Sequence, residues 1–194
     1  MSRSPDPSPS PALQRWLLEL ARSTVRSALD GGGLVLPDPG DVPAGAAIPG
    51  AAFVTLRRDG RLLGCIGSIE AHRSLAVDVA AHAYDAAFRD PRLPAVTDDD
   101  WHHMDVEISV LGPLERLPVS DRAELAGMLR PGVDGVLLTS AEGRGTFLPS
   151  VWSQVGGVDE FLDALWHKAG LPARRWPADL VVERYQVTEF AEGH

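Results

Sequence analysis

Residues 60–67 read Gly-Arg-Leu-Leu-Gly-Cys-Ile-Gly and contain the single cysteine of the chain. The preceding residues 51–58, Ala-Ala-Phe-Val-Thr-Leu-Arg-Arg, are rich in residues that favour strands. Between the two runs stands Asp59-Gly60, a dipeptide that readily adopts the two positive-φ positions of a tight hairpin turn. The pattern predicts two antiparallel strands joined at this turn.

The turn also predicts which residues face each other. Counting outwards from Asp59-Gly60 pairs Arg58 with Arg61 and Val54 with Cys65. Side chains alternate along a strand, so Cys65 should share a face with Leu63, opposite to Ile66.

Glycines at positions 64 and 67 bracket the thiol. Glycine weakens a strand and often marks a bulge or a close approach by another group. One interpretation is that these glycines expose the backbone around the sulfur to a ligand. The other is a core cysteine in a glycine-kinked strand, since free cysteine is among the most buried residue types.

The residues 60–67 resemble the signature of the AMMECR domain family, also called AmmeMemoRadiSam system protein A. Further motifs of that family follow in its order, at residues 90–92 (Asp-Pro-Arg), 106–111 (Val-Glu-Ile-Ser-Val-Leu), 132–136 (Gly-Val-Asp-Gly-Val), 147–152 (Phe-Leu-Pro-Ser-Val-Trp) and 161–171. The resemblance implies a single domain over residues 13–192, with a larger subdomain that contains both chain ends, a smaller one, and a cleft between them near Cys65. It also implies a shared pathway with a Memo-type protein and a radical S-adenosylmethionine enzyme, and names no cofactor.

The chain departs from the family pattern at Leu63, where the family has arginine. A guanidinium beside Cys65 would favour the thiolate, the form that attacks substrates and binds metals. Without it, either another positive group serves, with Arg92 as the first candidate, or Cys65 stays a neutral thiol.

Composition limits the classes of function and location. The 194 residues carry 27 acidic and 18 basic side chains, a net charge of −9, which disfavours nucleic acid as a partner. One cysteine permits no internal disulfide, and no apolar run approaches a membrane span of about 20 residues, so we expect a cytoplasmic protein. Residues 1–12 alternate proline with polar residues and are expected to form a disordered tail.

Helical periodicity predicts two long helices, one from Leu13 to near Leu29 and one from Leu75 to about Arg89, capped by Ser74. On the second helix, Asp78, His82 and Asp85 share one stripe, which is read as a solvated helix face rather than a catalytic group. Residues 97–100 form a capping box that begins a third helix, with an acidic first turn.

His102 and His103, with Asp105 and Glu107 nearby, resemble a metal-binding cluster. Adjacent histidines on a helix point about 100° apart and cannot easily face one ion, so no metal site is predicted. Residues 106–110 alternate apolar and polar side chains and predict a strand that carries Glu107.

The C-terminal half predicts a short helix at residues 120–129, a hairpin turning at Glu142-Gly143, a helix capped by Asp159 that ends near Ala169, and a last strand from Val181 to about Phe190. Because the strands come as hairpins and the helices between them are few, we predict an α+β fold with antiparallel sheets and packed helices. No nucleotide-binding, Cys-x-x-Cys or serine-hydrolase motif occurs in the sequence.

Two classes of function remain open. In the first, the protein is an enzyme or enzyme subunit in which Cys65 is a nucleophile or ligand, Glu107 accepts a proton and Arg92 holds an anion. The signature residues Gly64, Ile66 and Gly67 are then further binding positions. In the second, it is a non-catalytic module that binds a small molecule or a protein, Cys65 is structural, and Arg92 and Glu107 form a salt bridge between loop and sheet.

Overall fold

The computed structural model describes residues 8–173 and 175–192, which fold into two compact units of α+β architecture. Unit 1 comprises residues up to Leu111 together with the segment from Thr188, and unit 2 runs from Gly112 to Val187. The predicted α+β class with antiparallel sheets and a larger and a smaller subdomain is confirmed. Within the described ranges, no helix is both long and apolar enough to cross a membrane.

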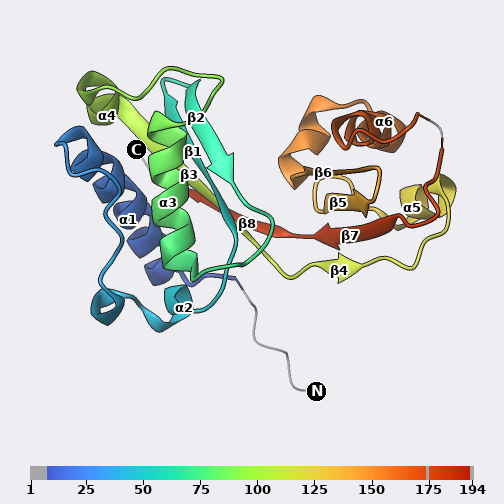
Figure 1. Ribbon diagram of the computed structural model, residues 1–194, viewed down its shortest axis with the longest axis horizontal. Helices are drawn as coiled ribbons and strands as arrows, with labels where there is room; N and C mark the ends of the chain where they lie inside the picture. The colour runs from blue at the N-terminus through green and yellow to red at the C-terminus, as the bar shows by residue number, and fades with distance from the viewer. Residues whose placement is uncertain (1–7, 174, 193–194) are drawn as a thin grey trace. The chain divides into compact units, whose positions relative to one another are not determined.

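Unit 1 is built on a four-stranded sheet in the order β2-β1-β3-β8 (Figure 1). Its strands are β1 (Ala52–Arg58), β2 (Arg61–Gly67), β3 (Met104–Leu111) and β8 (Val187–Ala191). β1 pairs antiparallel with both β2 and β3. Its alternate residues Val54 and Leu56 are fully buried, which makes one face of the sheet apolar.

Helices α1 (Pro11–Leu29) and α3 (Leu75–Phe88) pack side by side on this apolar face (Figure 1). Both begin at a serine N-cap, Ser10 and Ser74, whose hydroxyl accepts a backbone N–H of the first turn. The remaining helical segments of unit 1 are short: α2 (Ala44–Ala47), α4 (Asp98–His103) and a 3₁₀ turn, η1 (Pro39–Asp41). The predicted capping box between Thr97 and Asp100 begins α4.

The start of α1 corrects the predicted tail. The helix begins at Pro11, because proline fits the first turn where its missing N–H is not needed. Residues 1–7 of the predicted tail lie outside the described residues.

Unit 2 has its own four-stranded sheet, ordered β4-β7-β5-β6. Its strands are β4 (Glu115–Arg116), β5 (Gly135–Ser140), β6 (Gly143–Phe147) and β7 (Val181–Tyr185). Its helical segments are α5 (Arg122–Met128), the 3₁₀ helix η2 (Pro149–Gln154) and α6 (Val158–Lys168). The buried leucines of α5 and α6 join Val136, Leu138 and Trp152 in a core separate from that of unit 1.

Three predicted boundaries in the C-terminal half are wrong in detail. Ser140 pairs with Gly143, so the β5–β6 turn is Ala141-Glu142. Helix α6 begins after Gly157 rather than at Asp159, which lies in its first turn. The single predicted last strand is two strands, β7 in the sheet of unit 2 and β8 in that of unit 1, divided at Gln186.

Candidate functional site

Cys65 faces away from the helix layer of unit 1, contrary to the predicted register. The hairpin is regular at Arg58↔Arg61, but a bulge shifts the register so that Cys65 pairs with Thr55 instead of Val54. Leu63 and Gly64 are consecutive and both buried, whereas Cys65 is partly exposed. A bulge places two successive residues opposite one, which reverses the alternation that follows. Cys65 therefore does not share a face with Leu63.

The sulfur of Cys65 has a hydroxyl partner. Thr55 Oγ1 donates to Cys65 Sγ at 3.2 Å. Thr55 also pairs with Glu107 on β3, so Cys65, Thr55 and Glu107 occupy one row across three neighbouring strands. With strands about 4.8 Å apart, the Cα atoms of Cys65 and Glu107 are separated by roughly 10 Å.

Asp90 and Arg92 form a clamp on the backbone of Cys65. Asp90 Oδ2 accepts the Cys65 N–H at 3.0 Å, and Arg92 Nη2 donates to the Cys65 carbonyl oxygen at 2.9 Å. The two clamp residues bind each other through Arg92 Nε to Oδ1 at 2.8 Å and Nη2 to Oδ2 at 2.6 Å. We call this arrangement the Asp90–Arg92 clamp. The clamp provides hydrogen-bond partners for the N–H and the carbonyl oxygen of Cys65 on β2, an edge strand of the sheet.

The carboxylate of Asp90 is buried with its charge retained. Its side chain is 1% exposed. The hydrogen bonds from Arg92 lower the pKa of Asp90 far below its usual range, outweighing the effect of burial, and the Cys65 N–H adds to this.

Glu107 does not form the predicted salt bridge with Arg92. Its carboxylate lies 3.7 Å from Arg57 Nε on the neighbouring strand, while Arg92 is paired with Asp90. The structure brings Cys65 and Arg92 into contact through the peptide group and places Glu107 in the same row as Cys65. A site shared by all three side chains, and a cleft between the two units, stay predictions.

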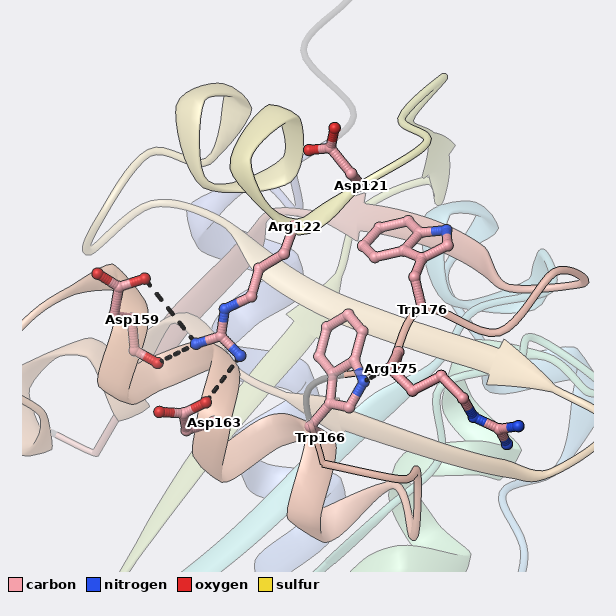
Figure 2. Close-up of a pocket in the computed structure, with 7 residues that line it drawn as sticks. All are labelled: Asp121, Arg122, Asp159, Asp163, Trp166, Arg175 and Trp176. Atoms are coloured by element: carbon pink, nitrogen blue, oxygen red, sulfur yellow. Dashed lines mark hydrogen bonds and ion pairs between the residues drawn. The ribbon is translucent and has the colours of Figure 1, made fainter.

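A second candidate site is a cavity of about 450 Å³ in unit 2, shown in Figure 2. Its wall comes from the start of α5, one side of α6 and the loop that follows α6, which contribute Asp121, Arg122, Asp159, Asp163, Trp166, Arg175 and Trp176. The Trp166 and Trp176 rings lie 5.6 Å apart between centroids, inclined by 40°. Trp166 Nε1 donates to the Arg175 carbonyl oxygen at 3.2 Å, which fixes the orientation of its ring.

Arg122 is held between two residues of α6. Its guanidinium donates to the Asp159 carbonyl oxygen at 2.7 Å and lies 2.7 Å from Asp163 Oδ1. Figure 2 shows these bonds on the side of the cavity opposite Trp176. Asp121 caps α5 by accepting the Glu124 N–H at 2.9 Å.

Comparison with known proteins identifies the family. The family model described as AMMECR1 matches residues 18–190. The chain belongs to the AMMECR1 family. A protein of Methanothermobacter thermautotrophicus is 39% identical over 181 residues, covering 92% of this chain and 93% of the relative. A protein of Thermotoga maritima is 36% identical over 141 residues, covering 72% of this chain and 76% of that protein.

A solved structure has the same fold. The crystal structure of the uncharacterized protein PH0010 from Pyrococcus horikoshii superposes with a TM-score of 0.82 at 30% identity. The match covers 91% of this chain and 90% of that one.

Several motifs of this AMMECR1 chain have structural roles. A Cβ atom at Gly64 would lie 1.8 Å from the Ala86 carbonyl oxygen of α3, and one at Gly67 would lie 2.3 Å from the Phe53 ring. The glycines thus allow a helix and a ring to approach the strand, which agrees with the predicted bulge or close approach. Ile66 packs, partly buried, against the core of unit 1.

His82 is buried, which corrects its predicted position on a solvated helix face. It is 7% exposed and Asp78 is 2% exposed. His82 Nε2 lies 3.3 Å from Asp78 Oδ1, which also accepts from Arg73 Nε at 2.9 Å, while Asp78 Oδ2 accepts the Ala52 N–H at 2.9 Å. Burial opposes the charge of Asp78, but the His82, Arg73 and Ala52 interactions outweigh it and lower the pKa of this carboxyl.

Metal binding has no geometric support in the described part of the chain, where no three His, Cys, Asp or Glu side chains gather into a possible ligand set. His102 and His103 each face a different aspartate of α4, Asp98 at 3.6 Å and Asp99 at 3.8 Å.

Sequence reasoning missed the cavity of unit 2 in this AMMECR1 protein. Trp166 falls within the predicted helix that ends near Ala169, and Trp176 belongs to no predicted element. A tryptophan in a proline-flanked loop, Trp176-Pro177, ten residues after one on a helix, is a weak signal for an aromatic wall.

Proposed function

We propose that this AMMECR1 protein is a non-catalytic module that binds a small molecule in the cavity of unit 2, and that Cys65 is structural. The observation that carries the proposal is the cavity of about 450 Å³ with two tryptophans in its wall. Small-molecule sites typically have volumes of about 300–1,000 Å³, with aromatic walls and a few placed polar groups. Arg122 and Asp163 supply such polar groups, already oriented by their ion pair.

The structural role of Cys65 is supported by the Asp90–Arg92 clamp. The charged groups of the Asp-Pro-Arg motif bind the N–H and carbonyl oxygen of Cys65. An edge strand leaves such peptide groups unpaired, and the clamp satisfies them. The co-occurrence of the two motifs is then explained by packing of the loop on the strand.

An enzyme that uses Cys65 is the second candidate. One observation favours it: the thiol is partly exposed, and Thr55 donates a hydrogen bond to its sulfur. In that case Arg92 and Glu107 would bind and orient the substrate.

Exposure to a cell-extract metabolite pool separates these functions. We expect the wild-type protein and Cys65→Ser to retain the same metabolites after gel filtration, as detected by mass spectrometry, and Trp176→Ala to lose them. Thermal unfolding of each variant serves as the control for folding. A covalent adduct on Cys65, or loss of retention in Cys65→Ser with retention intact in Trp176→Ala, would contradict the proposal and support the enzyme.

We also propose that the protein acts in a pathway with a Memo-type protein and a radical S-adenosylmethionine enzyme, in the cytoplasm. Family membership over residues 18–190 supports this proposal. Affinity purification of the tagged chain from its own cells, followed by mass spectrometry, tests it. Recovery of neither protein under mild crosslinking would count against a direct complex.

A further inference from the structure

We infer that the cavity of unit 2 takes an organic cation, with a flat apolar body and a protonated amine or quaternary ammonium group. This inference rests on the proposed function, because it names the ligand class of the same cavity. The two tryptophan rings, the charges in the wall and the fixed partners of Arg122 support it.

Trp176 offers an aromatic face to a ligand, and the buried ring of Trp166 packs beside it. Trp166 is 4% exposed, and its only polar atom, Nε1, is already hydrogen-bonded to the Arg175 carbonyl oxygen. The small part of Trp166 that reaches the cavity is therefore apolar. Trp176, inclined by 40° to Trp166, is half-buried beside it. The faces of tryptophan rings attract cations more strongly than those of other aromatic residues.

The charged residues in the wall also favour a cationic ligand. Three aspartates and two arginines line the cavity, a formal charge of −1. Arg175 pairs with Glu142, which is not among the lining residues, and in Figure 2 its side chain extends away from the indole rings. The side chains of Asp159 and Asp163 are 87% and 71% exposed, so their carboxylates remain open to a ligand from solvent.

Arg122 is poorly placed to bind an anion. Both of its terminal nitrogens have partners on α6, the Asp159 carbonyl oxygen and the Asp163 carboxylate, each at 2.7 Å. An anionic ligand would have to displace Asp163 and would then lie beside two carboxylates. A cation instead adds to the existing arrangement without breaking the Arg122–Asp163 pair.

A matched pair of probes tests the sign of the ligand charge. Tryptamine and indole-3-propionate share the indole ring and differ in carrying an ammonium or a carboxylate. Titration into ¹⁵N-labelled protein follows the indole N–H signals of all five tryptophans by NMR. We expect tryptamine to shift the Trp166 and Trp176 signals saturably, with Trp16 and Trp101 of unit 1 unchanged, and indole-3-propionate to bind at least about tenfold more weakly.

Substitutions locate the effect. Trp176→Ala should lower tryptamine affinity at least about tenfold through loss of one aromatic wall. Asp163→Asn should lower it about fivefold and should raise affinity for indole-3-propionate, because Arg122 loses its charged partner. Asp85→Asn is the matched control: it makes the same change in net charge at an ion-paired helical aspartate of unit 1. It should leave both affinities unchanged.

The outcomes separate this inference from the proposed function. Equal or tighter binding of indole-3-propionate at Trp166 and Trp176 overturns the cationic class and leaves a binding module. Tryptamine shifts that persist in Trp176→Ala place the probe elsewhere and overturn the inference. Failure of both probes, with no metabolite retained from the extract, overturns the inference and the proposed function together.

Discussion

Gly64 lies where β2 passes against α3, and its missing side chain is required there. A Cβ atom would be 1.8 Å from the Ala86 carbonyl oxygen, a backbone atom that cannot rotate away. Gly64→Ala should therefore separate the helix from the strand and lower the free energy of unfolding by about 2–4 kcal/mol. Urea unfolding followed by circular dichroism measures this difference.

Gly127→Ala is the matched control for Gly64→Ala. Gly127 is an exposed residue of α5, where a Cβ atom would meet nothing within 4 Å. Alanine is a better helix former than glycine, so the free energy of unfolding of this variant should rise by up to about 1 kcal/mol. Similar unfolding midpoints for the two variants would show that the close approach of Ala86 to Gly64 does not destabilise the alanine variant.

Tyr185 makes the stability of unit 2 sensitive to alkali. Its hydroxyl donates to the Phe147 carbonyl oxygen and lies 2.6 Å from Thr146 Oγ1. Burial raises its pKa to about 12, although the hydrogen bond with Thr146 opposes the shift. The neutral phenol thus contributes stability that is complete below about pH 10 and is lost as the pH rises towards about 12.

Denaturant unfolding across this alkaline range tests the Tyr185 prediction. As the pH rises, the free energy of unfolding of the wild type and of Tyr84→Phe should fall by on the order of 2 kcal/mol more than that of Tyr185→Phe. Tyr84→Phe is a fair control because Tyr84 is the other tyrosine of the chain and lies in unit 1. An identical alkaline dependence in all three proteins would disprove the assignment.

Among elements, the Asp90–Arg92 clamp ties the loop after α3 to the edge strand β2. Asp90→Asn removes a buried carboxylate that accepts two hydrogen bonds from the Arg92 guanidinium, one from the Arg92 N–H and one from the Cys65 N–H. We expect the free energy of unfolding of this variant to be about 3 kcal/mol lower than that of the wild type near neutral pH. Because the pKa of Asp90 is lowered in the folded state, its contribution is present above about pH 4 and is lost as the pH falls further.

The pH dependence distinguishes this effect from a simple packing defect. The difference in unfolding free energy between wild type and Asp90→Asn should shrink below about pH 4. Asp85→Asn, at an exposed ion pair of α3, should change stability by less than about 1 kcal/mol at every pH. A difference for Asp90→Asn that stays constant down to low pH would contradict the role of its charge.

The elements of this chain could be predicted from its sequence where local patterns decide them. The caps at Ser74 and Thr97 and the turn at Asp59-Gly60 follow from chemistry within a few residues. Gly64 indicated a bulge or a close approach, but the residue at which the register shifts could not be predicted, because it depends on α3 approaching Gly64 from another part of the chain. Strict alternation then assigned the wrong face to Cys65.

Long-range contacts also explain the other errors. His82 lies on the polar stripe of its helix, but Arg73 from the preceding loop covers it and Ala52 of β1 binds its partner Asp78. The cavity of unit 2 depends on Trp176 returning to Trp166 through a loop without a repeating pattern. Near Cys65, Arg92 binds Asp90 and not Glu107, and a site shared by Cys65, Arg92 and Glu107 stays a prediction.

At the scale of the whole molecule, the negative net charge disfavours binding of nucleic acids. A net charge of −9 at neutral pH repels phosphate backbones, and non-specific affinity for nucleic acids comes almost entirely from phosphate contacts. We expect no detectable binding to duplex or single-stranded DNA in the micromolar range at physiological salt, measured by fluorescence anisotropy. Micromolar binding with a steep salt dependence would refute this prediction.

Two separate cores predict that unit 2 folds by itself. It is one continuous segment, residues 112–187, with its own sheet and buried cluster. Trp152 stacks on Phe161 at 3.8 Å between centroids, and its Nε1 donates to the carbonyl oxygen of the buried Asp134 at 2.7 Å. We expect the isolated segment to show the indole N–H signals of Trp152, Trp166 and Trp176 at their positions in the full chain.

Trp152→Ala in the isolated segment provides the control. A core this small contributes only about 3–5 kcal/mol to the free energy of unfolding, and truncating a buried tryptophan lowers it by about the same amount. The variant segment should therefore be unfolded, with collapsed dispersion in its NMR spectrum. The same substitution in the full chain should leave the Trp16 and Trp101 signals unchanged, because these residues belong to unit 1. Random-coil signals from the unsubstituted segment would show that the core of unit 2 is not sufficient for folding.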